Sequence, residues 1–567
     1  MKELFGINVS AGYGIGPVYC YNPTEYIITE KKIVDTANEK AKLEKALTLS
    51  IEQLRKLHLD NAHDIGDTAD IIEAHITMIE DPDLKDSIVE KIEKGYNVEW
   101  AVDKTIKEYV DIFNNMNNEY FKERSLDIED IGKRIINNII GKTDKPLSKL
   151  KEKVILVTKE LTPSDTLSMD KDKILGIVTE TGGKTSHTAI LARTLGIPAV
   201  TGIDTITELV NNQENIIIDG TEGKIILEPE EFQINTYKQR IEKRRIQLEE
   251  EKSFIGCKTK TRDGYNCKIY CNMGSPEDVQ QVLNNDGEGI GLFRTEFLYM
   301  NRQTPPTEEE QYNIYSNVCK KLKGKEVIIR TLDVGGDKKI EYINIEDELN
   351  PFLGNRAIRY CLQEEKLLLT QLRAILRASK ECNIKIMFPM ITAYEEIIEA
   401  KKLLEEAKKK LIEEEKSFNE NIKVGIMIET PAAVFNSAEF AKEVDFFSIG
   451  TNDLTQYTCA VDRMNTKVSY LYSPYNPAVI KSIKMVVENA HGEGIEVSIC
   501  GETASDELLL PLWISLGIDE LSVIPRNVLG IRKHINSISR NETLINEAIK
   551  CKSGDEMIKF LKNKSVI

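Results

Sequence analysis

The sequence predicts a multi-domain α/β protein with a C-terminal (β/α)8 barrel, preceded by an α/β domain that an α-helical bundle interrupts. Three observations support this fold class. The chain has 567 residues, enough for about three to four domains of roughly 150 residues each. Its C-terminal half alternates eight short β-like runs with longer amphipathic runs. Its N-terminal half places a polar, helix-periodic region between β-like runs that contain glycine turns.

The helical bundle is predicted for residues 34–144, where leucine and isoleucine recur at helical spacing within polar sequence. His75 falls on a charged stretch there, so we interpret it as solvent-facing in preference to a partner contact. The β-like runs on either side, in residues 1–33 and 145–229, are predicted to form one α/β domain. The GYGIG run at 12–16 is interpreted as a turn, because no helix pattern follows it.

A highly charged run without glycine or proline predicts a solvated helix within a linker of residues 230–256. The barrel is predicted for residues 257–567. Its eight strands are expected at Cys267–Cys271, Gly289–Phe293, Val327–Arg330, Ile384–Pro389, Val424–Glu429, Phe446–Gly450, Glu496–Cys500 and Glu520–Val523. In this interpretation Cys267 and Cys271 are strand residues, and a metal site is the less favoured alternative.

The composition excludes several classes of protein. With 75 basic and 92 acidic side chains the formal net charge is −17, which argues against a general nucleic-acid binder. Hydrophobic residues make up 41% and charged residues 29%, as in globular chains. No signal-peptide core and no bilayer-spanning apolar run is visible. We therefore expect a cytoplasmic protein without membrane insertion, and reduced thiols, because the ten cysteines are scattered.

Chemically useful side chains gather where the predicted barrel strands end. In a (β/α)8 barrel the C-terminal strand ends form one rim, the mouth, which carries the active site. The residues at these ends are Arg294, Arg330, Glu429, Asn452, Asp453 and Cys500. Arginine guanidinium groups suit phosphate oxygens, and the carboxylates of Glu429 and Asp453 suit Mg²⁺. The predicted ligand is a small phosphorylated anion with a metal. Surface ion pairs are the alternative, which the convergence on one rim disfavours.

His187 lies in the other half of the chain, in the run TGGKTSHTAILARTLGIPAV at 181–200. The glycines allow a tight turn, and Thr185 and Ser186 suit the N-cap of a helix over Ala189–Leu195. His187 is therefore expected at a helix N-terminus. There the helix dipole disfavours imidazolium, which keeps a nucleophilic neutral ring, and free N–H groups can stabilise an attached phosphoryl group. A structural histidine is the alternative, which the polar first turn disfavours.

Motifs in a fixed order extend over essentially the whole chain. They are LTPSDT (161–166), GGKTSHTAILAR (182–193), GIGLFRTEFLYM (289–300), RTLDVGGDK (330–338), NPFLGNRAIR (350–359), MIETPAA (427–433), FFSIGTNDLTQYTCAVDR (446–463) and CGETASDE (500–507). Matches of this length, in this order, are very specific. Together they resemble one family, Enzyme I of the phosphoenolpyruvate:sugar phosphotransferase system.

The resemblance implies a role for each matched residue. His187 of GGKTSH would be the phosphorylated nucleophile, with Thr166 of LTPSDT beside it. The implied substrate-binding residues are Arg294, Arg330, Asn452, Asp453 and Arg463, with Arg356 in support. Glu429 and Asp453 would hold Mg²⁺, and Cys500 would protonate the enolate carbon as pyruvate forms.

The resemblance also implies a reaction and its partners. A swivelling phosphohistidine domain, at 1–33 and 145–229, would take the phosphoryl group of phosphoenolpyruvate and pass it to a histidine of the carrier protein HPr, as the first step of sugar uptake. Residues 34–144 would bind HPr, and the barrel would bind phosphoenolpyruvate and form a homodimer. The alternatives are an enzyme like phosphoenolpyruvate synthase or pyruvate phosphate dikinase without its nucleotide domain, and a non-catalytic phosphoenolpyruvate sensor. The sequence contains no Walker A loop.

Overall fold

The chain divides into two compact units, Met1–Leu248 and Glu249–Ile567, and each is considered by itself. The computed structural model describes residues 2–21, 28–60, 67–114, 119–141, 147, 150–162, 165–166, 169–183, 187–300, 302–336, 340, 342–343, 345–346, 348–463, 465 and 467–565. Among these residues, no helix combines the length and the apolar character that crossing a bilayer requires.

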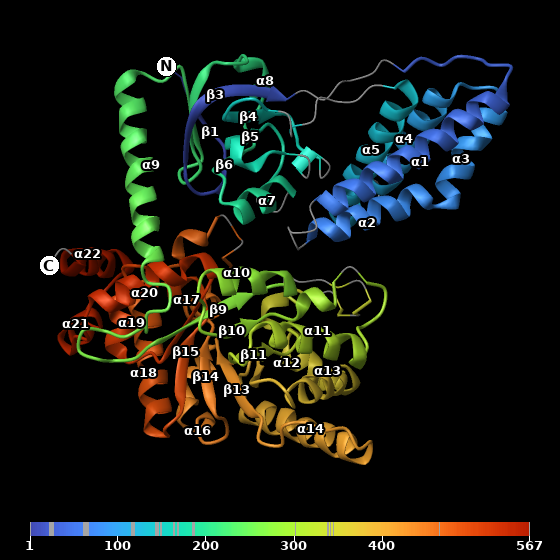
Figure 1. The fold of residues 1–567 in the computed structure, drawn as a ribbon. Coiled ribbons are helices and arrows are strands. Elements are labelled where there is room, and N and C mark those ends of the chain that lie inside the picture. The colour runs from blue at the N-terminus through green and yellow to red at the C-terminus, as the bar shows by residue number, and fades with distance from the viewer. Residues whose placement is uncertain are drawn as a thin grey trace. The chain divides into compact units, whose positions relative to one another are not determined.

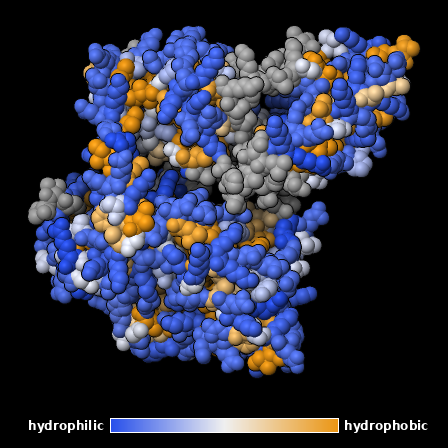
Figure 2. Space-filling view, in the orientation of Figure 1, coloured by the Kyte–Doolittle hydropathy of each residue, from blue (hydrophilic) through white to orange (hydrophobic). Residues whose placement is uncertain are grey.

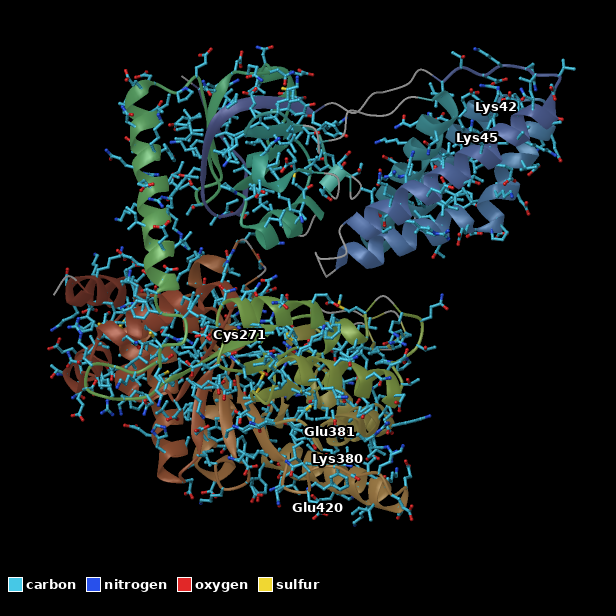
Figure 3. The ribbon with its side chains drawn as sticks, viewed as in Figure 1. Lys42, Lys45, Cys271, Lys380, Glu381 and Glu420 are labelled. Atoms are coloured by element: carbon cyan, nitrogen blue, oxygen red, sulfur yellow. The ribbon has the colours of Figure 1, made fainter. Side chains whose placement is uncertain are left out.

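The second unit contains a closed barrel of eight parallel strands (Figure 1). The strands are β9 (Lys268–Met273), β10 (Ile290–Phe293), β11 (Val327–Arg330), β12 (Ile384–Phe388), β13 (Lys423–Ile428), β14 (Phe446–Ile449), β15 (Glu496–Ile499) and β16 (Glu520–Val523), and β16 pairs with β9 to close the ring. The prediction of a (β/α)8 barrel is confirmed, and every predicted run overlaps one of these strands. Cys271, labelled in Figure 3, lies in β9, as the strand interpretation expected, whereas Cys267 lies just before the first residue of this strand.

Helices between and after the strands cover the barrel. They are α10 (Val279–Asn284), α11 (Glu308–Lys321), α12 (Ile358–Gln363), α13 (Glu365–Ala378), α14 (Tyr394–Glu413), α15 (Pro431–Phe435), α16 (Ser437–Phe440), α17 (Thr451–Cys459), α18 (Pro477–Gly492), α19 (Leu510–Leu516), α20 (Val528–Ser537), α21 (Glu542–Ala548) and α22 (Gly554–Ser565). The outward strand residues, such as Phe293 and Ile329, join the helices in one large apolar core. The face visible in Figure 2 is largely hydrophilic, with small separate apolar patches.

The barrel interior has an apolar layer below the mouth and a charged layer at the opposite end. The apolar layer consists of Leu292, Ile328, Met387, Met427, Phe446 and Cys500. In the charged layer, Lys385 pairs with Glu326 at 2.7 Å and Lys268 with Glu496 at 2.8 Å. Glu520 lies among them and is 4% exposed. Burial, reinforced by the charge of Glu326, raises the pKa of Glu520 to about 8.

The first unit contains an eight-stranded sheet in the order β1-β8-β7-β3-β4-β5-β6-β2. Its strands are β1 (Lys2–Phe5), β2 (Ile7–Ser10), β3 (Tyr13–Tyr21), β4 (Val154–Thr158), β5 (Ile174–Thr179), β6 (Ala199–Thr201), β7 (Asn215–Asp219) and β8 (Lys224–Leu227). Helix α7 (His187–Leu195) connects β5 to β6, and helix α8 (Ile206–Leu209) lies between β6 and β7 in the sequence. Segments from both sides of the helical region thus share one sheet, since β3 pairs with β4 in parallel.

The interpretation of residues 12–16 as a turn is wrong, because β3 begins at Tyr13. Glycine is needed inside the strand for close approach: a Cβ atom on Gly14 would lie 2.3 Å from the carbonyl oxygen of Leu175. The GYGIG run therefore marks a crowded place in the sheet, where neighbouring backbone leaves no room for a side chain.

Between β3 and β4, the described residues form a bundle of five helices. The helices are α1 (Thr36–Asp60), α2 (Asp67–Glu80), α3 (Pro82–Glu93), α4 (Val98–Asn114) and α5 (Glu119–Ile140). The interpretation of His75 as solvent-facing is wrong: its side chain is 2% exposed, and its Nε2 lies 3.2 Å from Asp127 Oδ1. The helical period explains this burial, since His75 shares one face of α2 with the buried residues Ile72 and Ile79.

Helix α9 (Glu231–Lys252) occupies the highly charged run that the sequence identifies as a linker helix. Its side chains are mostly exposed, as expected for a helix that is polar on nearly all sides. The division between the two units falls within this helix.

The charged layer of the barrel predicts an unusual pH dependence of stability. The pKa of Glu520 is about 8 in the folded chain, against an ordinary value of 4.5. Between these values the folded state holds a proton that the unfolded state has lost, so stability falls as pH rises. Glutamine at position 520 is neutral at every pH. Over this pH range we therefore expect the free energy of unfolding of Glu520→Gln to decrease by on the order of 1–3 kcal/mol less than that of the wild type.

Chemical unfolding at several pH values from about 5 to about 8 checks this expectation. Glu420→Gln is the matched control, because Glu420 is an exposed carboxylate outside this layer. Parallel pH profiles for wild type and Glu520→Gln would contradict a proton held on Glu520.

Candidate active site

The predicted mouth residues lie at the C-terminal ends of the barrel strands. Arg330 is the last residue of β11, and Arg294, Glu429 and Cys500 directly follow β10, β13 and β15. Asn452 and Asp453 lie in the first turn of α17, which follows β14. Since all eight strands are parallel, these ends meet at one rim of the barrel.

Two buried arginines are bridged by one carboxylate. Asp333 Oδ2 lies 3.1 Å from Arg330 Nη1, and Asp333 Oδ1 accepts from Arg356 Nη2 at 3.0 Å. Glu296 also accepts a hydrogen bond from Arg330. Arg330 is 5% exposed, and Arg356 and Asp333 are each 2% exposed. The carboxylates fix the two guanidinium groups in place, where water could not screen them.

Several polar atoms of this cluster have no hydrogen-bond partner among the described residues. They are Arg330 Nε, Arg356 Nε, Arg463 Nη1 and Asp453 Oδ1, all of them buried. Buried polar atoms are nearly always paired, so these four atoms are available to a ligand that enters the mouth. Three of the four are guanidinium donors, which suit an anion with several oxygens.

Glu429 and Asp453 form the acidic side of the site. Glu429 is 1% exposed, and one of its oxygens accepts from the backbone N–H of Met390 at 2.5 Å. Asp453 Oδ1 lies 3.6 Å from Arg356 Nη1. Burial, and then the nearby charges of Asp453 and Asp333, raise the pKa of Glu429 above its ordinary value.

These two carboxylates fit a divalent cation such as Mg²⁺. Mg²⁺ is typically bound by one or two protein carboxylates and completes its shell with substrate and water oxygens. A cation would relieve the repulsion between Glu429 and Asp453 and would contact Asp453 Oδ1, which accepts no hydrogen bond among the described residues. No group of three or more potential ligand side chains occurs in the described part of the chain. Glu429 and Asp453 would therefore leave coordination positions of the cation open to substrate and water oxygens.

Cys500 is a protonated thiol at the bottom of the mouth. It is 3% exposed, and its Sγ donates to the carbonyl of Ile449 at 3.6 Å. Burial raises the pKa of Cys500 to about 11, while the nearby charges of Arg330 and Arg294 lower it. At neutral pH the thiol thus keeps its proton, as a proton donor requires.

The remaining mouth residues are Asn452, Arg463 and Arg294. Asn452 Oδ1 accepts from the backbone N–H of Glu502 at 3.2 Å, which ties α17 to the loop after Cys500. The backbone N–H of Arg463 donates to Gln456 at 3.1 Å. The side chain of Arg294 is exposed, so it is the mouth arginine most open to solvent.

His187 and Thr166 belong to the first unit. His187 is the first residue of α7, so the expected helix N-terminus is confirmed for the backbone. The side chain of His187 and the proposed caps Thr185 and Ser186 lie outside the described residues. Thr166 is 6% exposed, and its backbone N–H donates to Thr162 at 3.1 Å. Its position beside His187 stays a prediction.

Sequence reasoning did not predict how the two arginines are held. It considered pairs of Arg330 with Asp333 and of Arg294 with Glu296 only as a surface alternative, whereas Asp333 and Glu296 both pair with Arg330 in the interior. It also missed Tyr457, whose hydroxyl accepts from Arg356 at 3.3 Å and donates to the carbonyl of Phe352. The only signal in the sequence is that Asp333 follows Arg330 closely on the loop that leaves the strand.

Comparisons with known proteins identify the family. Family models of PEP-utilising enzymes match residues 5–124 (the N-terminal domain), 150–223 (the mobile domain) and 248–540 (the PEP-binding domain). The phosphoenolpyruvate-protein phosphotransferase of Bacillus subtilis (strain 168) is 42% identical over 566 residues, which cover 99% of each chain. The chain belongs to the phosphoenolpyruvate-protein phosphotransferase family. Both the barrel unit and the sheet unit are therefore parts of that family's architecture.

One further relative and one solved structure are also similar to the chain. The phosphoenolpyruvate-protein phosphotransferase of Staphylococcus aureus (strain MSSA476) is 42% identical over 567 residues and likewise covers 99% of each chain. An NMR solution structure of Enzyme I (nEIt) is 37% identical and covers 43% of this chain and 99% of that chain, with a TM-score of 0.39.

Gly450 gives a direct test of the acidic side of the site. A Cβ atom there would lie 2.7 Å from Glu429 Oε2 and 3.1 Å from Glu429 Cβ. Gly450→Ala must therefore displace the Glu429 carboxylate. We expect Mg²⁺-dependent release of pyruvate from phosphoenolpyruvate to fall by about 100-fold, the cost of misplacing a site group by about 1 Å.

Steady-state pyruvate assays over a series of Mg²⁺ concentrations measure this effect. Gly492→Ala is the matched control, because a Cβ atom on Gly492 meets nothing within 4 Å. Wild-type activity and Mg²⁺ dependence in Gly450→Ala would show that the position of Glu429 does not matter.

Proposed function

We propose that the chain is a phosphoenolpyruvate-protein phosphotransferase that phosphorylates its own His187. The phosphoryl group of phosphoenolpyruvate passes to His187 and then to a histidine of the carrier protein HPr, and pyruvate is released, as the first step of sugar uptake by the phosphotransferase system. The observation that carries this proposal is the buried mouth cluster, where the donors of Arg330 and Arg356 stand beside the carboxylates of Glu429 and Asp453.

In this proposal the mouth binds phosphoenolpyruvate through charge and hydrogen bonds. The binding groups are Arg294, Arg330, Asn452, Asp453 and Arg463, with Arg356 in support. The guanidinium donors neutralise and orient the phosphoryl oxygens, and positioning supplies most of the catalysis in phosphoryl transfer. Glu429 and Asp453 would hold Mg²⁺, which would supply further neutralisation of phosphoryl charge when bound.

His187 and Cys500 carry out the two bond changes. The imidazole nitrogen of His187 attacks phosphorus, and the bond from phosphorus to the enol oxygen breaks, which leaves the enolate of pyruvate. The Cys500 thiol gives its proton to the terminal carbon of that enolate and is reprotonated from solvent. Burial suits Cys500 for this role, because it keeps the thiol protonated near neutral pH.

Transfer requires that parts of both units meet. His187 belongs to the first unit and the phosphate-binding cluster to the second. In this proposal the α/β domain, residues 1–33 and 145–229, swivels so that His187 reaches the mouth in one half-reaction and HPr in the other. The helical domain, residues 34–144, docks HPr, and Thr166 supports His187.

The remaining features of the proposal follow from the family. The barrel, residues 257–567, joins two copies of the chain in a homodimer, and the enzyme works in the cytoplasm. No nucleotide takes part, which distinguishes this function from that of a phosphoenolpyruvate synthase or pyruvate phosphate dikinase. A phosphoenolpyruvate sensor would bind the same ligand without turnover.

Incubation with phosphoenolpyruvate carrying a labelled phosphate, with Mg²⁺ and without ATP, tests the proposal. We expect one acid-labile, base-stable label per chain, as a phosphohistidine gives, and its removal by HPr. His187→Ala should take up no label, because the nucleophile is gone. The release of pyruvate, measured in the same samples, should match the label.

His534→Ala is a matched control, because His534 is a histidine of the barrel unit outside the mouth. Equal labelling of wild type and His187→Ala would refute the assignment of the nucleophile. Binding of phosphoenolpyruvate without label or pyruvate would establish the sensor instead.

Replacement of Cys500 separates binding from turnover. Cys500→Ala removes the proton donor, so we expect pyruvate formation to slow by about 10²–10⁴-fold, the usual contribution of a general acid. Binding of phosphoenolpyruvate should weaken little, because the guanidinium donors are intact. Calorimetric binding and stopped-flow pyruvate assays measure the two effects. Cys257→Ser, at an exposed cysteine, is the control, and an unchanged rate in Cys500→Ala would assign the proton to another group.

A further inference from the structure

A buried glutamine of the barrel wall connects the two loops that follow β10 and β11, here called the rim loops. Gln371 lies on α13 and is 1% exposed. Its Oε1 accepts from the backbone N–H of Leu332 at 3.0 Å, and its Nε2 donates to Thr295 Oγ1 at 3.1 Å. Thr295 directly follows Arg294, and Leu332 comes shortly after Arg330. One side chain thus holds both loops that carry a mouth arginine.

The directions of the hydrogen bonds in this contact are fixed. A backbone N–H can only donate, so the oxygen of the Gln371 amide must face Leu332, and the nitrogen is left to donate to Thr295. The hydroxyl of Thr295 donates in turn to the carbonyl of Arg330 at 2.9 Å. The same nitrogen of Gln371 also donates to the Tyr315 hydroxyl at 3.3 Å. The amide therefore uses its acceptor and both of its donor protons.

The groups that contact the amide are shielded from water. Thr295 and Tyr315 are fully buried, and Leu332 is nearly so. A buried polar group is costly to leave without a partner, and here water cannot replace one that is lost. The amide of Gln371 therefore keeps the rim loops in one arrangement.

The carboxylates that orient Arg330 lie next to the atoms that Gln371 holds. Glu296 directly follows Thr295 on one rim loop. Asp333 is the next residue after the bonded N–H on the other. Both carboxylates contact the Arg330 guanidinium. A shift of either rim loop would therefore also shift a carboxylate and the guanidinium that it orients.

We propose that Gln371 is a positioning residue for phosphoenolpyruvate. It fixes the rim loops so that the Arg330 guanidinium meets the phosphoryl oxygens, and it acts through Thr295 and Leu332 without touching the substrate. The packing of α13 against the barrel thereby becomes part of the geometry of the mouth. This inference deepens the proposed function and rests on it.

Gln371→Met in the full-length chain tests the proposal, because methionine has a similar length but lacks the amide. Steady-state assays of pyruvate release from phosphoenolpyruvate with Mg²⁺ give kcat and KM. We expect KM to rise about tenfold and kcat/KM to fall about 100-fold, as when a site group is misplaced by about 1 Å. A loss of folded chain would lower the apparent kcat and leave KM unchanged, so KM separates positioning from stability.

Gln311→Met is the matched control. Gln311 is also 1% exposed, and it accepts from the same Tyr315 hydroxyl at 3.1 Å. Its other hydrogen bonds join it to the Tyr299 hydroxyl and to the carbonyl of Pro306. Both variants should lose stability, because each removes a buried amide, whereas only Gln371→Met should change KM.

Two further variants test the path through Thr295. Thr295→Ser keeps the hydroxyl and should keep the wild-type KM, whereas Thr295→Val removes it and should raise KM. In a chain with both Gln371→Met and Thr295→Val, the rise in KM should be smaller than the product of the two single rises, because the two residues act in one chain of hydrogen bonds. The Thr295 variants decide the question should Gln371→Met fail to fold.

An unchanged KM in Gln371→Met, or an equal rise in Gln311→Met, would overturn the inference. A wild-type chain without turnover would instead refute the proposed function. The calorimetric Kd for phosphoenolpyruvate then replaces KM, and an equal Kd in wild type and Gln371→Met would overturn the positioning role. A wild type that does not bind phosphoenolpyruvate would refute both.

Discussion

Closure of the parallel barrel is the constraint on which the rest of the second unit depends. A closed ring of parallel strands has no unpaired edge, and it places every C-terminal strand end at the same rim. Residues far apart in sequence, such as Arg330 and Cys500, are thereby brought close enough for the charge of Arg330 to lower the pKa of the Cys500 thiol. The apolar layer directly below the rim, which includes Ile328 and Met427, keeps water from the lower side of that site. Electrostatic interactions at the rim are strengthened by this exclusion.

Charge balance explains why Asp333 and Glu296 belong to the site as much as the arginines do. A buried guanidinium without a partner costs several kcal/mol, so two of them could not stand side by side in an apolar interior by themselves. Asp333 contacts both Arg330 and Arg356, and Glu296 contacts Arg330. The carboxylates satisfy part of each guanidinium and leave its Nε unpaired. The site is thus stable before an anion arrives and still has donors for it.

The sequence predicted the barrel well because strands of this kind are buried on both faces. Such strands appear as short continuous apolar runs, and VIIR at 327–330 or FFSI at 446–449 can be recognised without a partner. Contacts between distant segments could not be recognised in that way. The bridge of Asp333 to Arg356 depends on where the loop after β11 folds back, and the burial of His75 beside Asp127 depends on how α2 and α5 pack. The motifs indicated which residues lie at the mouth, and only the structure showed what holds them.

The two ends of the barrel show why one of them is a ligand site. Both contain buried charges of both signs. At the end opposite the mouth, each lysine has a carboxylate partner, Lys385 with Glu326 and Lys268 with Glu496. Burial and the charge of Glu326 raise the pKa of the extra carboxylate, Glu520, and the carboxylate partners of the two lysines leave that end without an excess of positive charge. At the mouth, guanidinium donors without a hydrogen-bond partner lie beside Asp453 Oδ1, which accepts no hydrogen bond among the described residues. An anion that brings a cation satisfies both at once, and a phosphate ester with Mg²⁺ is such a ligand.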